Sequence, residues 1–139
     1  MNALLDTGFL LAVLDADDKL HPACVKALQG TSNPILPDAV IPELAYMVLR
    51  ELGYEVLITF LDSLLNGELT IEKTTRTDLA RAREILQKYA DSRIDFVDCV
   101  IAAMAERLEI QRILTVDRRH FSLFRPHPWG YFEIIPPYA

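Results

Sequence analysis

The chain has 139 residues, of which 51% are hydrophobic and 24% are charged. This length predicts one compact domain over residues 1–139, with enough apolar side chains for a single core. The net charge of −6 argues against loose, non-specific binding of nucleic acid, although it does not exclude a nucleic-acid substrate bound at a local site.

The sequence gives no sign of a membrane or secretory segment. No apolar run reaches the roughly 18 residues needed to span a bilayer. The first residues have no basic region and reach Asp6 at once, so no signal peptide is visible. Cys24 and Cys99 lie in apolar, helix-like patterns, which favours buried thiols over a disulfide or a zinc site. We therefore expect a cytoplasmic protein.

The N-terminal third alternates short apolar strands with helices. Residues 2–5 predict a strand that runs into Asp6, and residues 9–15 predict the helix that follows, capped by Asp6 or Thr7. A second helix is expected to start at the His21-Pro22 dipeptide, because proline is tolerated in a first helical turn.

The next strand is expected at residues 34–36, and Asp38 is expected to cap the helix after it. Pro42 must lie in the first turn of that helix, which places Glu43 about one turn in, near the strand end. Residues 54–65 predict another helix that is apolar on more than one face. Such a helix is either deeply buried or a dimer surface.

The second half of the chain repeats the alternation. A short strand is expected at residues 69–71, then an amphipathic helix over 75–89 in which Leu79 faces inward. Asp95 and Asp98 open a helix of small residues, and residues 112–116 form a strand that runs into Asp117. Residues 131–135 are expected to supply an edge strand.

This order predicts an α/β fold, a three-layer α/β/α sandwich with a mostly parallel central sheet. In such sheets ligands bind outside the carboxyl ends of the strands. Four acids are expected at this edge: Asp6, Glu43, Asp98 and Asp117. Carboxylates this close repel one another unless a hard divalent cation such as Mg²⁺ or Mn²⁺ lies among them.

Each acid alone also has a structural explanation. Asp6 and Asp117 have the positions of helix N-caps, and Asp98 lies at a helix start where negative charge is favourable. Glu43 alone would be an ordinary acid on a helix surface. The metal-site hypothesis rests on the four acids taken together.

The sequence resembles the PIN-domain family, and more narrowly the VapC-type ribonuclease toxins of prokaryotic toxin–antitoxin pairs. The matching segments lie in order along nearly the whole chain: Leu5 to Leu11, Ile41 to Leu44, Asp95 to Ala105 and Ile113 to Asp117.

The resemblance implies an endoribonuclease that cleaves single-stranded RNA with Mg²⁺ or Mn²⁺, usually as a homodimer and paired with an antitoxin. By position, the catalytic and metal-binding residues would be Asp6, Glu43, Asp98 and Asp117. Thr115 would support Asp117 by hydrogen bonding, and Thr7 and Asp95 would lie around the ligands, Asp95 as an extra acid or only as a helix cap. PIN domains also occur in RNA-processing proteins that are not toxins.

After Asp117 the chain becomes basic and aromatic. Arg118 and Arg119 are candidate contacts to RNA phosphates because they adjoin a proposed ligand. For Phe121 and Phe124, core packing is favoured over stacking on bases, since their spacing suits a short helix facing the core.

Two other functions are compatible with parts of this pattern. A phospho-accepting signalling domain also has acids at strand ends, but it resembles this chain less because Lys88 is the last lysine and precedes the final strands. A non-catalytic RNA-binding or protein-binding module would retain the acids and use the apolar helix at 54–65 as its main surface.

Overall fold

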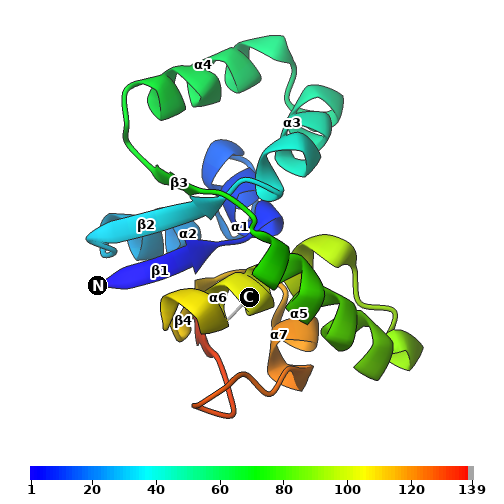
Figure 1. Cartoon of the computed structure of the whole chain (residues 1–139). Coiled ribbons are helices and arrows are strands. Elements are labelled where there is room, and N and C mark those ends of the chain that lie inside the picture. The colour runs from blue at the N-terminus through cyan, green and yellow to red at the C-terminus, as the bar shows by residue number, and fades with distance from the viewer. Residues whose placement is uncertain (138–139) are drawn as a thin grey trace.

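A computed structural model describes residues 1–137 of the chain. Its centre is a five-stranded sheet in which every neighbouring pair is parallel, in the order β3-β2-β1-β4-β5 (Figure 1). The strands are β1 (Asn2–Leu5), β2 (Asn33–Pro37), β3 (Thr70–Glu72), β4 (Arg112–Leu114) and β5 (Glu133–Ile135).

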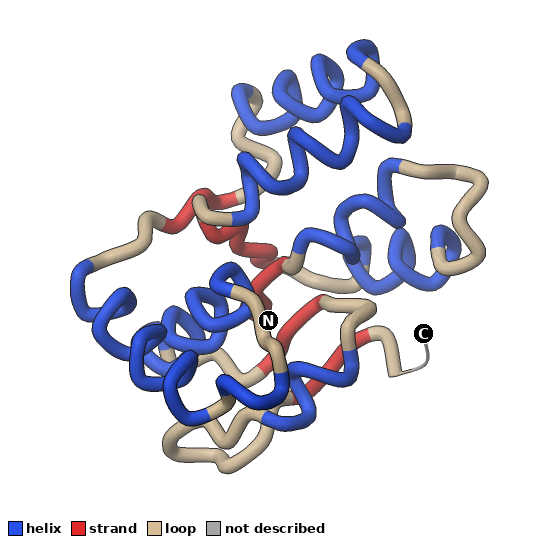
Figure 2. Tube along the Cα trace, turned by 90° about the vertical axis from the view of Figure 1, so that its right-hand side faces the viewer, coloured by secondary structure: helices blue, strands red, loops and turns tan. Residues whose placement is uncertain are grey.

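Helices cover both faces of this sheet (Figures 1 and 2). One layer holds α1 (Thr7–Leu14) and α2 (His21–Gln29), and the other holds α5 (Arg76–Lys88), α6 (Phe96–Leu108) and α7 (Arg118–Leu123). A short 3₁₀ helix, η1 (Ala90–Ser92), leads into α6. The predicted three-layer sandwich with a parallel sheet is confirmed.

The core lies where α6 packs between the sheet and α5. Residues 98–105 of α6 are all buried, and three of the last four are alanines. Small side chains let this helix approach neighbours on two sides, which explains why it carries so long a buried run. The helix therefore holds Asp98, its third residue, in a rigid place.

The helices α3 (Val40–Glu51) and α4 (Tyr54–Leu65) form a hairpin that projects beyond the sheet (Figure 1). Gly53 joins them with φ at 93°, a backbone conformation that glycine adopts without strain. Of the α4 residues, all of which the structure describes, Phe60 alone is buried. The deeply buried alternative for this helix is therefore wrong.

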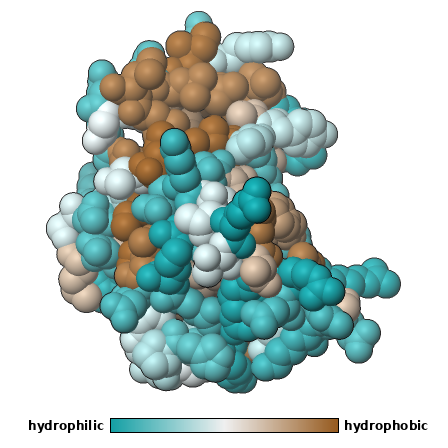
Figure 3. Space-filling view, viewed as in Figure 1, coloured by the Kyte–Doolittle hydropathy of each residue, from teal (hydrophilic) through white to brown (hydrophobic). Residues whose placement is uncertain are grey.

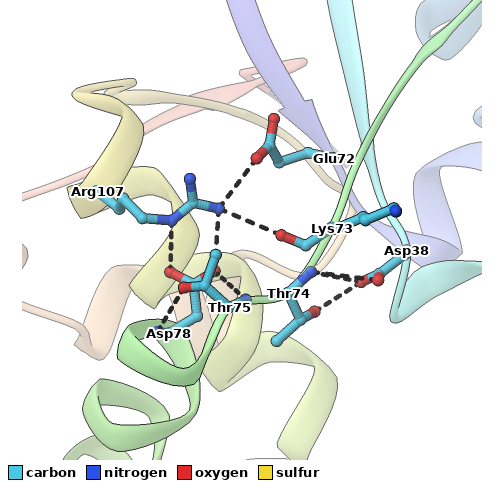
Figure 4. Close-up of polar contacts among 7 residues, drawn as sticks. All are labelled: Asp38, Glu72, Lys73, Thr74, Thr75, Asp78 and Arg107. Carbon is cyan, nitrogen blue, oxygen red and sulfur yellow. Dashed lines mark hydrogen bonds and ion pairs between the residues drawn. The ribbon is translucent and has the colours of Figure 1, made fainter.

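Asp38 does not cap α3, contrary to the sequence-based prediction. Its carboxylate instead accepts hydrogen bonds from the backbone N–H and the hydroxyl of Thr74, the latter at 2.6 Å (Figure 4). The N-cap of α3 is Ala39, which makes no side-chain bond. Asp38 is thus used to join the segments that follow β2 and β3.

Two smaller predictions also fail. Leu79 is 46% exposed, because α5 turns Ala82 and Ile85 toward the core instead. Strand β4 ends at Leu114, two residues early, since the hydroxyl of Thr115 accepts a hydrogen bond from the N–H of Asp117 at 2.9 Å and turns the chain. The predicted edge strand near the C-terminus is present as β5.

Arg107 fastens α6 to the rest of this layer (Figure 4). Its guanidinium donates two hydrogen bonds to Asp78 of α5, at 2.9 and 3.0 Å, and one to Glu72 of β3 at 3.1 Å. The side chain of Asp78 is 1% exposed, so this ion pair is held in a fixed geometry. Arg107 is in the last turn of α6, whereas Asp98 is in the first turn. The bonds of Arg107 therefore fix the end of the helix opposite to Asp98.

Candidate functional site

The chain runs from β1 to β2 and β3 on one side of the sheet, and from β4 to β5 on the other side. The order of the strands therefore reverses between β1 and β4. Parallel α/β sheets bind ligands at such a point, outside the carboxyl ends of the strands. A cleft of about 260 Å³ opens there. Its lining includes all four predicted acids together with neighbouring residues: Asp6, Thr7, Gly8, Glu43, Met47, Asp95, Asp98, Val116 and Asp117.

Asp6 follows β1 and is 5% exposed. One oxygen, Oδ1, accepts a hydrogen bond from the backbone N–H of Thr7 at 2.7 Å, which makes Asp6 the N-cap of α1. The other oxygen, Oδ2, accepts a 2.7 Å bond from the hydroxyl of Thr115. Asp6 is therefore both a cap and a cleft residue, so the two explanations of this acid are compatible.

The hydrogen bond expected between Thr115 and Asp117 is present: the Thr115 hydroxyl accepts from the backbone N–H of Asp117. The same hydroxyl also donates to Asp6, a contact that the sequence did not suggest. Thr115 thus fixes the ends of β1 and β4 against each other.

Asp98 reaches the cleft from the first turn of α6 and is 4% exposed. Its N–H donates a 2.8 Å hydrogen bond to Oδ1 of Asp95, so Asp95 is the helix cap that the sequence suggested. Asp95 also lines the cleft from its exposed rim. Glu43, in the first turn of α3, completes the ring from the opposite side.

His120 is a member of the site that the sequence analysis missed. Its Nδ1 lies 2.8 Å from Oδ2 of Asp98 and 3.1 Å from Oδ2 of Asp117. The available signal was its spacing: His120 lies three residues after Asp117, and residues three apart share a face of a helix. The sequence analysis grouped it with the basic tail instead.

The buried acids are difficult to ionise without a counter-charge. Burial raises the pKa of Asp98 to about 9, reinforced by the nearby carboxylates of Asp6, Asp95, Asp117 and Glu43. Burial also raises the pKa of Asp6 to about 6, although the hydrogen bonds from Thr115 and Thr7 oppose that rise. A bound cation would remove the cost of holding these negative charges together.

The fold and this cleft can now be compared with known proteins. The sequence profile of the PIN domain matches residues 3–125. The chain belongs to the PIN-domain family.

A curated relative, ribonuclease VapC26 of Mycobacterium tuberculosis, is 32% identical over 134 residues, which cover 96% of this chain and 99% of the relative. Among solved structures, M. tuberculosis VapC20, described as a sarcin–ricin loop cleaving toxin, has a TM-score of 0.74 at 20% identity, covering 80% of this chain and 86% of that one. A toxin–antitoxin complex from Klebsiella pneumoniae has a TM-score of 0.72 at 17% identity, covering 99% and 98%.

The donor set of this PIN domain fits a divalent cation. The cleft presents carboxylate oxygens, which Mg²⁺ and Mn²⁺ prefer. The hydroxyl oxygen of Thr7, which lines the same cleft, is buried and has no hydrogen-bond partner within the described residues 1–137. A buried polar atom of this kind normally has a partner, so a water or ion in the cleft would satisfy it.

The two arginines that follow Asp117 in this PIN domain are not among the residues that line the cleft. Arg118 and Arg119 are exposed at the start of α7, and Arg118 donates a 3.1 Å hydrogen bond to the carbonyl of Pro136. Phe121 and Phe124 are 0% and 2% exposed, which confirms that they pack the core. The two phenylalanines contact edge to face, with ring centroids 5.6 Å apart.

A larger groove of the PIN domain lies elsewhere, between α2 and β5, with a volume of about 490 Å³. Its lining is mostly apolar and includes no carboxylate side chain among the described residues. The cleft lined by the acids is smaller, but it holds the carboxylates that can bind a cation.

Within residues 1–137 no helix is long and apolar enough to cross a membrane.

Proposed function

We propose that this PIN domain is an endoribonuclease that uses Mg²⁺ or Mn²⁺ to cleave single-stranded RNA, and that it is the toxin of a toxin–antitoxin pair. The observation that carries the proposal is the convergence of Asp6, Glu43, Asp98 and Asp117 on one cleft. The relationship to a protein named as a ribonuclease over nearly the full length supports the activity.

In this proposal the four carboxylates bind the cation, and each has a defined support. Asp6 is oriented by Thr7 and Thr115, Asp98 by the start of α6, and Asp117 by its bond with the N–H of His120 at 3.2 Å. The cation, when bound, supplies a Lewis acid that activates water for attack on a phosphodiester and stabilises the leaving oxygen. No serine, cysteine or lysine nucleophile is required.

The substrate side of the cleft is formed by the start of α7. Arg118 and Arg119 are the proposed contacts to phosphates, because they follow Asp117 directly and are exposed. The overall charge of −6 makes binding depend on such local cations. We propose that the protein works in the cytoplasm, where its RNA substrates are.

We further propose that the apolar face of α4 is covered by a second copy of the chain in a homodimer. The large side chains exposed on α4 fall at positions 54, 58, 61 and 65, a spacing of four, three and four residues that lines one helix face. Tyr46 and Leu49 of the neighbouring α3 are exposed as well, and Figure 3 shows a hydrophobic area over this hairpin. Exposed apolar patches of this kind mark interaction sites.

An antitoxin is the other proposed partner. Several structures with this fold are complexes of a toxin with its antitoxin, including those from Klebsiella pneumoniae and Rickettsia felis. Expression of the wild-type chain without an antitoxin should slow bacterial growth, and Asp6→Asn should relieve that effect. Equal growth with both variants would argue for a PIN nuclease of RNA processing.

Cleavage of a mixed set of single-stranded and duplex RNAs tests the activity. The purified chain should cut single strands internally with Mn²⁺ or Mg²⁺ and lose that activity in EDTA. If it binds RNA without cutting it at any metal concentration, the non-catalytic alternative replaces this proposal.

A further inference from the structure

The imidazole of His120 contacts the carboxylates of two proposed ligands, Asp98 and Asp117. Its Nδ1 is 2.8 Å from Oδ2 of Asp98 and 3.1 Å from Oδ2 of Asp117. In octahedral coordination with bonds of about 2.1 Å, neighbouring ligand atoms lie about 3.0 Å apart. The nitrogen therefore has the same spacing from both oxygens as a third ligand atom would have.

The position of the imidazole is fixed by the structure around it. Oδ1 of Asp117 caps α7 by accepting from the N–H of His120, which leaves Oδ2 to face the imidazole. Phe121, the next residue, is fully buried and anchors α7 to the core. The His120 side chain is 15% exposed, so it is held between α7 and α6 rather than free in solvent.

The three atoms also form a compact group. One atom from each of Asp98, Asp117 and His120 lies within 4.8 Å of the other two, and the three residues come from the starts of two helices that pack together. In the metal-free protein the 2.8 Å contact between His120 and Asp98 is a hydrogen bond. The same nitrogen lies 3.1 Å from Asp117, so without its proton it would present a lone pair to an ion shared by both oxygens.

We propose that Nδ1 of His120 is a direct ligand of the divalent cation, and that this nitrogen makes the site select Mn²⁺ over Mg²⁺. The inference rests on the proposed metal-dependent function. Mg²⁺ favours an all-oxygen shell, whereas divalent transition-metal ions, of which Mn²⁺ is the first in the affinity series, accept an imidazole nitrogen more readily than Mg²⁺ does. The Nδ1 lone pair faces the ion, and the ring proton is on Nε2.

Pulsed electron paramagnetic resonance of bound Mn²⁺ tests the ligand directly, because it detects a nitrogen nucleus coordinated to the ion. The wild-type protein should give a ¹⁴N signal that changes to a ¹⁵N signal when the protein is labelled with ¹⁵N-histidine. His120→Gln should lose the signal, and His127→Gln should keep it, since His127 is an exposed histidine outside the cleft.

Calorimetry on the same variants gives an independent readout. His120→Gln should weaken Mn²⁺ binding by about 10–100-fold, the range seen when groups that support a metal site are removed, and should weaken Mg²⁺ binding much less. Far-ultraviolet circular dichroism checks that the variant is folded, and the isotope experiment on wild type does not depend on any variant.

Two results would overturn the inference and leave the proposed function intact: bound Mn²⁺ without a histidine nitrogen signal in wild type, or an equal loss of Mn²⁺ and Mg²⁺ affinity in His120→Gln. The latter result would mean that His120 only positions Asp98 and Asp117. Failure of wild type to bind Mn²⁺ at all would instead remove both the proposed function and this inference.

Discussion

The hydroxyl of Thr115 donates a 2.7 Å hydrogen bond to the carboxylate of Asp6, and it does so across the gap where β1 and β4 end. The same oxygen accepts from the N–H of Asp117 at 2.9 Å. The hydroxyl of Thr115, which is 0% exposed, therefore fixes two proposed ligands at once: Asp6 through its carboxylate and Asp117 through its backbone N–H. Its hydrogen bond also lowers the pKa of Asp6 against the effect of burial.

Replacing that hydroxyl should damage both the fold and the metal site. Thr115→Val should lower the free energy of unfolding by about 1–3 kcal/mol, because it leaves the N–H of Asp117 and Oδ2 of the buried Asp6 each without a hydrogen-bond partner. Mn²⁺ affinity should fall as well. Denaturant unfolding and calorimetry measure the two effects, and Thr115→Ser, which keeps the hydroxyl, should retain most of both. Wild-type affinity in the valine variant would contradict this role.

Replacing the ionisable carboxyl group of Asp98 by an amide should stabilise the metal-free protein. Burial and neighbouring acids raise the pKa of Asp98 to about 9, so the folded state resists losing this proton while the unfolded chain loses it near its ordinary value of 3.8. The contribution of Asp98 to wild-type stability should therefore be greatest below about pH 4 and fall as pH rises toward 9.

The Asp98→Asn variant cannot lose a proton there, so its advantage in unfolding free energy should grow with pH over the same window. At pH 8 the variant should be more stable by a few kcal/mol at most, because the gain from removing this ionisation is partly offset by the lost hydrogen bond with His120. Urea unfolding in EDTA at several pH values measures it. Asp17→Asn, an exposed acid in the turn after α1, should give no such trend.

Metal binding should release protons from the cleft. At pH 7 the carboxyl group of Asp98 retains its proton in the metal-free state, since its pKa is raised to about 9, and the cation must displace it. Mn²⁺ affinity should therefore increase between pH 6 and pH 9. Titrations in buffers of different ionisation enthalpy should show proton release near pH 7, and buffer-independent heats would contradict it.

Much of the fold could be predicted from local patterns. Strand β1, the helix starts at Asp95 and Thr75, and the position of Pro42 in α3 follow from apolar runs, capping residues and proline chemistry. The convergence of the acids could be inferred because parallel strands bring their carboxyl ends to one edge.

The predictions that failed depend on contacts between distant segments. Asp38 has the local signature of a cap, but a partner 36 residues away, Thr74, binds its carboxylate. Leu79 fits the helical stripe, yet the buried face of α5 runs through Asp78, Ala82 and Ile85, where Arg107 of α6 binds Asp78, and Leu79 lies beside that face. His120 was missed because its link to Asp98 spans 22 residues, and only its spacing from Asp117 was visible.

The exposed face of α4 should determine the oligomeric state. Leu61→Glu introduces a charge in the middle of the apolar stripe and should convert a dimer into a monomer in sedimentation velocity experiments. Leu79→Glu is a matched control, because Leu79 is similarly exposed on α5, at 46% against 40% for Leu61. A wild-type chain that sediments as a monomer at all concentrations would leave α4 to a different partner.

The central claim is that the acids of the cleft cleave RNA through a bound cation, and single-turnover cleavage of a single-stranded RNA at saturating Mn²⁺ tests it most directly. Wild type and Asp17→Asn should cleave at the same rate, whereas Asp6→Asn and Asp98→Asn should lose at least about 100-fold, and EDTA should abolish cleavage by all four proteins. Equal rates for all four proteins, unaffected by EDTA, would contradict the account.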